Sequence, residues 1–122
     1  MNSRVKKIGV CIMAANNRTE KYSEVQEYVN ILSAFPEIER IYLFGSYAYG
    51  EPFEHSDIDI AVILSDTANA NKSAYKIEKA LAFRKTPIDL FIDKSSRFKN
   101  YGNHISTLQN DIITKGVLMY DK

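Results

Sequence analysis

Hydrophobic residues recur with helical spacing in three stretches of the chain, each bounded by residues that begin or end helices. Between Thr19 and Phe35, apolar side chains recur at steps of three and four residues, and Pro36 follows. This stretch is predicted to form an amphipathic helix. The same spacing predicts a second helix that begins at Asp66. A last helix is predicted between a cap at Asn103 and a glycine that follows Lys115.

Four other stretches are rich in the β-branched and aromatic residues that strands favour. They comprise residues 40–44, 57–64, 87–93 and 117–120. The last is predicted to be a short, peripheral strand, and an apolar run at residues 5–15 fits a strand or a helix. Because strands and helices alternate, we predict an α+β fold in which helices pack on one face of a small mixed β-sheet. Residues 1–122 are expected to form a single domain.

Two aspartates lie on one face of the predicted strand 57–64. Side chains two residues apart in a strand point the same way, about 7 Å apart along the backbone. Asp57 and Asp59 therefore share a face, while apolar residues fill the other. The two carboxylates repel each other, and a divalent cation between them would remove that repulsion. Because carboxylate oxygens suit Mg²⁺ or Mn²⁺, the pair predicts a metal site; the alternative is that both are ordinary surface residues.

A third carboxylate is expected from the predicted strand 87–93. Asp89 and Asp93 have the same parity in this strand but lie about 13 Å apart, so only one of them can join Asp57 and Asp59. We choose Asp89, because its apolar neighbours set it within the strand, whereas after Asp93 the strand is expected to give way to a polar loop. Asp57, Asp59 and Asp89 are thus predicted to form a catalytic, metal-binding cluster.

A Gly-Ser pair directly follows the predicted strand 40–44. Gly45 would let a phosphate approach the backbone closely, and the hydroxyl group of Ser46 and exposed N–H groups of the turn can donate hydrogen bonds. Such a turn, followed after ten residues by an Asp-Ile-Asp strand, is typical of a site for phosphoryl or nucleotidyl transfer. The structural alternative for Ser46 is a plain turn residue.

The Gly-Ser turn and the Asp-Ile-Asp strand that follows it resemble the signature of the DNA-polymerase-β-like nucleotidyltransferase superfamily. The likeness extends from Ile41 to Tyr120 and is greatest to the minimal nucleotidyltransferase domains. It implies the nucleotidyltransferase fold, a nucleoside triphosphate as substrate and two Mg²⁺ or Mn²⁺ ions. By this resemblance the metal ligands and catalytic residues are Asp57, Asp59 and Asp89, and the residues that contact the triphosphate are Gly45 and Ser46.

Many minimal nucleotidyltransferase domains are antitoxins paired with all-helical toxins of the HEPN family, so the resemblance also implies a protein partner. The implied reaction moves AMP from ATP to a tyrosine hydroxyl of that toxin, as a protein adenylyltransferase does. Relatives usually carry arginine after Gly-Ser, whereas this chain has Tyr47 and Tyr49. Both tyrosines are expected to pack in the interior, with stacking on a base as the alternative. Transfer to a small, aminoglycoside-like molecule and toxin silencing by contact alone remain alternative functions.

Composition narrows the classes of function further. The 122 residues include 16 basic and 15 acidic ones, and this net charge of +1 argues against direct binding of nucleic acid. No apolar stretch approaches the length of a membrane-spanning helix, so a cytoplasmic protein without membrane contact is expected. Cys11 is expected to be a buried, inert thiol, and His55 and His104 to be exposed. A basic cluster within residues 94–99 is expected to be solvated, and assembly of the chain with itself remains open.

Overall fold

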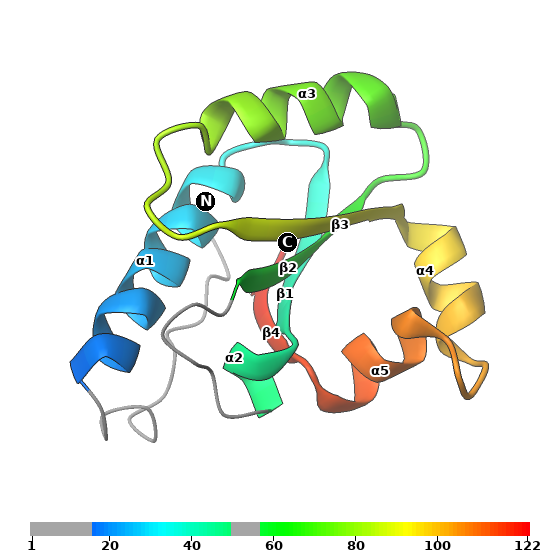
Figure 1. Cartoon of the computed structure of the whole chain (residues 1–122). Coiled ribbons are helices and arrows are strands. Elements are labelled where there is room, and N and C mark those ends of the chain that lie inside the picture. The colour runs from blue at the N-terminus through cyan, green and yellow to red at the C-terminus, as the bar shows by residue number, and fades with distance from the viewer. Residues whose placement is uncertain (1–15, 50–56) are drawn as a thin grey trace.

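A computed structural model describes residues 16–49 and 57–122, with the side chains of residues 16–21 and of Tyr49 left out. The described elements follow one another as α1 (Asn16–Leu32), β1 (Ile38–Phe44), α2 (Ser46–Tyr49), β2 (Ile58–Leu64), α3 (Ala70–Ala80), β3 (Ile88–Lys94), α4 (Ser95–Gly102), α5 (Leu108–Lys115) and β4 (Val117–Asp121) (Figure 1). No helix in these ranges is long and apolar enough to cross a membrane. The expectations for Cys11, His55 and residues 5–15 lie outside the described residues.

The strands form one four-stranded sheet in the order β3-β2-β1-β4. β1 runs antiparallel to β2 and to β4, and β2 runs parallel to β3. The mixed sheet that the alternating pattern predicts is therefore confirmed, and the last strand lies at an edge as expected. β2 is buried along nearly its whole length, which explains why its sequence reads as an almost continuous apolar run.

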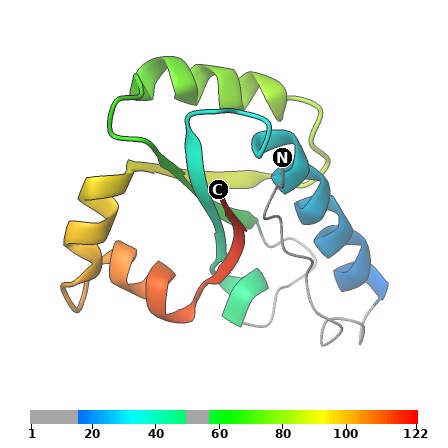
Figure 2. The same ribbon diagram turned by 180° about the vertical axis from the view of Figure 1, so that it is seen from behind.

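Apolar side chains form two cores, one on each face of the sheet. In the larger core, Val25 of α1 and Ile77 of α3 pack against the strands. In the smaller core, Ile63 of β2 packs with Phe98 of α4 and Ile112 of α5. Figures 1 and 2 show α1 and α3 on one side of the sheet and α4 and α5 on the other. The expectation that helices cover one face thus describes the larger core, and the opposite face is partly covered as well.

The start of α3 differs from the prediction because of a contact between segments far apart in the sequence. α3 begins at Ala70 rather than at Asp66, and the side chain of Asn69 caps it by accepting a hydrogen bond from the N–H group of Lys72 at 3.1 Å. Asp66 instead accepts hydrogen bonds from the N–H group of Ser96, at 2.9 Å, and from its hydroxyl group. A loop residue before α3 therefore caps the first turn of α4.

The segment after β3 was expected to be a polar loop, and it is the helix α4. Phe98 explains the difference, because its ring is buried against Tyr42 with 5.4 Å between ring centroids. Asn103, predicted as the cap of the last helix, directly follows the end of α4. Thr107 caps α5 instead, by accepting a hydrogen bond from the N–H group of Asn110 at 3.0 Å.

Replacing Asp66 with alanine is expected to loosen the first turn of α4, because the N–H group of Ser96 loses its acceptor. Amide hydrogen exchange of residues 95–98 should become faster, and the melting temperature should fall. Asp121→Ala serves as control, since this exposed carboxylate is only loosely paired with Arg40 at 3.8 Å. Unchanged protection of α4 in Asp66→Ala would contradict the capping role.

Candidate active site

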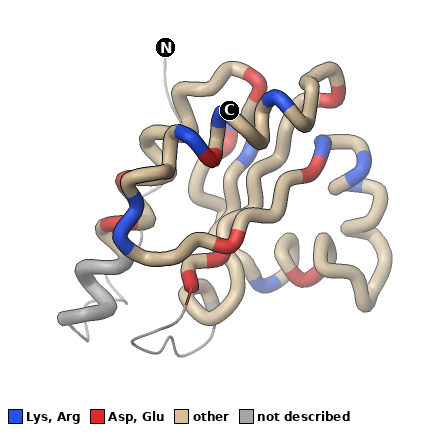
Figure 3. Tube along the Cα trace, turned by 45° about the horizontal axis from the view of Figure 1, so that its top comes forward, with Lys and Arg blue, Asp and Glu red and all other residues tan. Residues whose placement is uncertain are grey.

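The predicted site residues meet at the end of the sheet where β1 ends and where β2 and β3 begin. Because β1 is antiparallel to β2, Phe44 at the end of β1 lies opposite Asp59. Because β3 is parallel to β2, Asp89 lies level with Asp59 on the other side. The turn at Gly45, the start of β2 and the start of β3 are thus brought to one place, and acidic positions gather at this end of the sheet (Figure 3).

Asp59 and Asp89 form a pair of like charges in adjacent strands. Burial is the largest cause that raises the pKa of Asp59, followed by the negative charges of Asp89 and Asp57 and by a hydrogen bond with the carboxyl group of Asp89. Together these raise the pKa of Asp59 to about 6, from 3.8. The backbone pairing thus holds the two carboxyl groups together against their repulsion.

Gly45 makes room for the carboxylate of Asp59. Its φ of +73° lies in the left-handed region that glycine adopts easily. A Cβ atom on this residue would lie 2.0 Å from Oδ2 of Asp59, which is far inside contact distance. From the sequence alone, this glycine is explained by the approach of a phosphate. The structure adds a second reason, because any side chain at Gly45 would collide with Asp59. Ser46 follows at the start of α2 and is partly exposed.

Tyr47, which directly follows Ser46, packs in the interior. It is 2% exposed and meets the ring of Tyr22 edge-on, with 5.4 Å between centroids. The hydroxyl group of Tyr22 also donates a hydrogen bond to the backbone carbonyl group of Tyr47. The expectation that Tyr47 is a packing residue is confirmed, and it ties the turn after Gly45 to α1.

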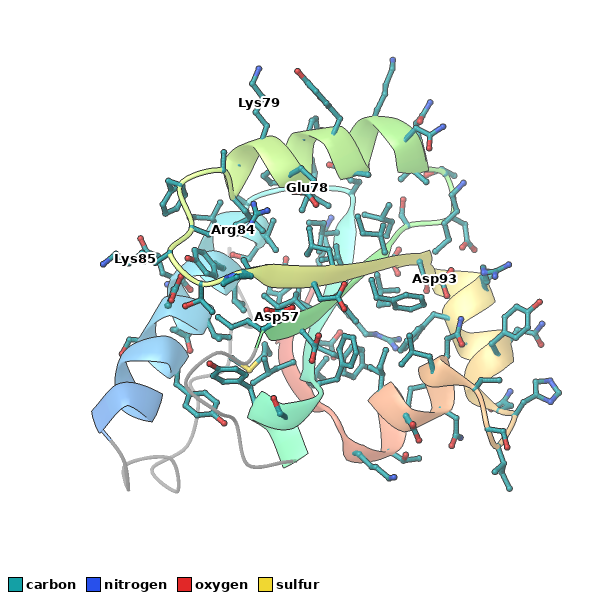
Figure 4. All side chains as sticks on the ribbon, in the orientation of Figure 1. Asp57, Glu78, Lys79, Arg84, Lys85 and Asp93 are labelled. Atoms are coloured by element: carbon teal, nitrogen blue, oxygen red, sulfur yellow. The ribbon has the colours of Figure 1, made fainter. Side chains whose placement is uncertain are left out.

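Asp93 lies at the far end of β3 and has a different environment. It is level with Ile63 and is 6% exposed, although the sequence placed it where the strand gives way to a loop. Its carboxylate is 3.2 Å from Nε of Arg97 and accepts a hydrogen bond from Gln109 at 3.2 Å. Figure 4 shows Asp57 and Asp93 at opposite ends of the β2–β3 pair. Asp93 is therefore a neutralised, structural carboxylate, and Arg97 of the basic cluster is part of its environment.

The acids at the start of β2 and β3 suit a hard divalent cation. A cation beside Asp59 and Asp89 would relieve the repulsion that raises the pKa of Asp59. Mg²⁺ is commonly bound by one or two carboxylates together with phosphate oxygens of a substrate. Among residues 16–49 and 57–122, no three His, Cys, Asp or Glu side chains converge as a metal site, and Asp57 is exposed. Strand pairing thus holds Asp59 level with Asp89, whereas Asp57 directly precedes β2 and acts on Asp59 through its charge.

Helix α1 contributes a contact at this end of the molecule that no sequence pattern predicts. Glu24 of α1 accepts hydrogen bonds from the backbone of Lys85 and Thr86, in the loop that leads into β3. The contact spans about 60 residues of sequence, so no local spacing or motif points to it.

Comparison with known proteins gives consistent matches. A family model described as polymerase beta, nucleotidyltransferase matches residues 26–122. The protein adenylyltransferase MntA of Shewanella oneidensis is 45% identical over 47 residues, which are 38% of this chain and 33% of that protein. The aligned segment therefore spans about a third of the length of this curated relative.

Solved structures share the fold. A candidate nucleotidyltransferase from Sulfolobus solfataricus superposes with a TM-score of 0.62 over 90% of this chain and 93% of its own, at 19% identity. A mutant of the toxin–antitoxin pair MntA–HpeT superposes with a TM-score of 0.55 over 80% of this chain and 72% of its own, at 27% identity. A toxin–antitoxin complex with AMP-PNP gives 0.50 over 82% and 73%, at 26% identity. These likenesses confirm the predicted fold class.

The raised pKa of Asp59 predicts how the stability of the metal-free protein depends on pH. Between pH 3.8 and about 6, Asp59 holds more of its proton in the folded state than in the unfolded state, so its contribution to stability falls as the pH rises through this interval. Asp59→Asn should remove the penalty and stabilise the EDTA-treated protein at about pH 8 by on the order of 1 kcal/mol, a value reduced for solvent screening. Below about pH 4 the variant and the parent should be equally stable.

Chemical denaturation at the two pH values measures this difference. Asp111→Asn, which alters an exposed carboxylate in α5, is the control and should show no such pH-dependent gain. An advantage of Asp59→Asn over the parent that is the same at about pH 4 and at about pH 8 would contradict the close pairing of Asp59 with Asp89.

Proposed function

The chain belongs to the polymerase beta nucleotidyltransferase family, and from this premise we propose that it transfers AMP from ATP to a tyrosine hydroxyl of a helical, HEPN-type toxin. The observation that carries the proposal is the like-charged pair Asp59–Asp89 beside the glycine turn at Gly45. This arrangement destabilises the empty protein, and a protein that acts by contact alone has no need of it. The pair therefore favours catalysis over silencing by contact.

The proposed reaction is an in-line displacement at the α-phosphorus of ATP. The oxygen of the acceptor hydroxyl group forms a bond to this phosphorus. The bond between the α-phosphorus and the oxygen that bridges it to the β-phosphate breaks, and pyrophosphate leaves with the electron pair. We assign the proton of the hydroxyl group to an Oδ atom of Asp89. Gly45 and Ser46 are assigned to the triphosphate, because the turn they form lies directly beside Asp59.

The proposed cofactors are two Mg²⁺ or Mn²⁺ ions, held by Asp57, Asp59 and Asp89. Bound ions of this kind neutralise the charge that develops on the phosphate oxygens during transfer. The role of the protein is to hold the carboxylates at a fixed spacing before substrate arrives, and the strand pairing of β2 and β3 supports this for Asp59 and Asp89.

The proposed partner and nucleotide rest on the relatives. One relative is named a protein adenylyltransferase, a structural neighbour is a toxin–antitoxin pair, and another was solved with the ATP analogue AMP-PNP. One observation favours a second candidate, an antitoxin that acts by contact alone. Tyr47 is buried where relatives usually carry an arginine, so the side chain after Ser46 offers no charge to a triphosphate.

The test is incubation of the purified protein with Mg²⁺ and ATP, with and without the product of the neighbouring gene, followed by mass spectrometry of both chains. Added AMP on a toxin tyrosine is the expected result. Asp89→Asn should lower the rate of transfer by at least about 100-fold while ATP binding changes little, because Asp57 and Asp59 remain. A parent protein that silences the toxin without any transfer would establish the contact-only function instead.

Asp93→Asn is the matched control on the same strand. It should destabilise the fold by roughly 1–3 kcal/mol, because Arg97 and Gln109 lose a buried charged partner. Below its melting temperature it should transfer AMP at close to the parental rate. An inactive Asp93→Asn beside an active Asp89→Asn would overturn the assignment of the third acid.

A further inference from the structure

Helix α1 touches the two segments that flank the acidic pair. Through Tyr22 it packs on Tyr47, directly after the Gly45–Ser46 turn. Through Glu24, less than one helical turn further on, it holds the loop before β3. Figure 1 shows α1 beside this end of the sheet, with the loop that leads into β3 passing close to it and α2 lower in the view.

The carboxylate of Glu24 binds two successive backbone N–H groups. Its Oε2 accepts hydrogen bonds from the N–H groups of Lys85 at 3.0 Å and Thr86 at 2.8 Å, and its Oε1 accepts one from the Thr86 hydroxyl group at 2.7 Å. Tyr28, one turn along α1, donates its hydroxyl to Glu24. Burial works to raise the pKa of Glu24, but these hydrogen bonds outweigh it and hold the pKa below 4.5. Both oxygens of the Glu24 carboxylate therefore accept hydrogen bonds within the protein.

Glu24 makes these hydrogen bonds directly before β3, at residues that do not donate backbone hydrogen bonds to β2. Pro87 has no N–H group to donate. The N–H group of Lys85 donates to Glu24 and to the Tyr28 hydroxyl group, and that of Thr86 donates to Glu24. The first backbone bond between the strands runs from the N–H group of Ile58 to the carbonyl group of Pro87, at 2.9 Å. The loop held by Glu24 therefore leads directly into the pairing of β2 with β3, and Asp89 is two residues further on.

We propose that Glu24 is a positioning residue that sets Asp89 level with Asp59. The inference rests on the proposed function for its effect on catalysis, but not for its effect on the strand. Glu24 lies before residues 26–122, which match the family model, so membership of the family does not supply this contact. The side chain of Glu24 is long enough to extend from α1 to the backbone of Lys85 and Thr86, and its hydrogen bonds there fix the position of the loop that leads into β3.

Two substitutions separate the reach of Glu24 from its charge. Glu24→Gln keeps the length of the side chain: its remaining oxygen can accept the two backbone N–H groups, and its amide nitrogen can donate to the hydroxyl group of Thr86. Glu24→Asp keeps the charge but is one methylene shorter, so it cannot reach the same atoms from α1. Positioning by reach predicts that Gln preserves the function and Asp impairs it, whereas a purely electrostatic role predicts the reverse. Glu27→Asp, at an exposed position of the same helix, is the matched control.

The first measurement needs no activity. Amide exchange of Ile58, whose N–H group donates to Pro87, reports directly on the entry into β3. In the metal-free protein this exchange should become at least about tenfold faster in Glu24→Asp, change little in Glu24→Gln and Glu27→Asp, and remain parental for the amides of β4 in all three. Equal protection of Ile58 in Glu24→Asp and the parent overturns the proposal, whether or not the chain transfers AMP.

The second measurement is steady-state AMP transfer below the melting temperature of each variant. Glu24→Asp should lower kcat by at least about tenfold, because small misplacements of a reacting group are costly, with KM for ATP within about twofold of the parent. Glu24→Gln should retain most of kcat. A loss confined to KM, or an impaired Gln beside an active Asp, overturns positioning by reach. A parent without transfer refutes the proposed function alone, since the exchange of Ile58 still decides the role of Glu24.

Discussion

The parallel contact between β2 and β3 brings together two side chains that repel each other. Backbone hydrogen bonds fix the register, and this register sets Asp59 beside Asp89. The apolar residues of the same strands lie in cores on both faces of the sheet, and their burial provides the free energy that holds the pair in place. The neighbouring segments fit this constraint: Gly45 has no side chain, so the carboxylate of Asp59 has room beside the turn.

Two aspartates of β3 show how environment gives one residue type two roles. Asp89 is exposed at the start of the strand, beside another carboxylate. Asp93 is buried at the end of the strand, with a guanidinium group and an amide as partners. A carboxylate that is already paired with a positive group binds a cation weakly. A carboxylate beside another negative charge is stabilised when a cation binds, because the repulsion is relieved. The difference comes from Arg97 of α4 and Gln109 of α5, which contact Asp93, and not from the strand itself.

The alternation of side chains in strands predicted most of this site from sequence. The parity of Asp57, Asp59 and Asp89, and the turn before them, follow from spacing alone, and the structure brings Asp59 and Asp89 together. The positions that sequence reasoning misjudged depend on distant partners. Asp66 reads as the start of the next helix but caps α4, and the polar segment after Asp93 is helical because Phe98 finds a buried place against Tyr42. The role of Glu24 could not be predicted from the sequence, because it accepts these hydrogen bonds only when the loop before β3 lies against α1.

The order of strands in the sheet also bears on how the chain is made. β1 lies between β2, which comes soon after it in the sequence, and β4, whose Tyr120 pairs with Ile41 from a great distance along the chain. On the ribosome, β1 and β2 are available to each other early, whereas the partner for the other side of β1 emerges much later. A nascent chain that already holds its acidic pair would therefore still expose an unpaired edge of β1, which other strands can bind. During synthesis, the part of the sheet that carries the acidic pair can therefore form while the opposite edge of β1 is still uncovered.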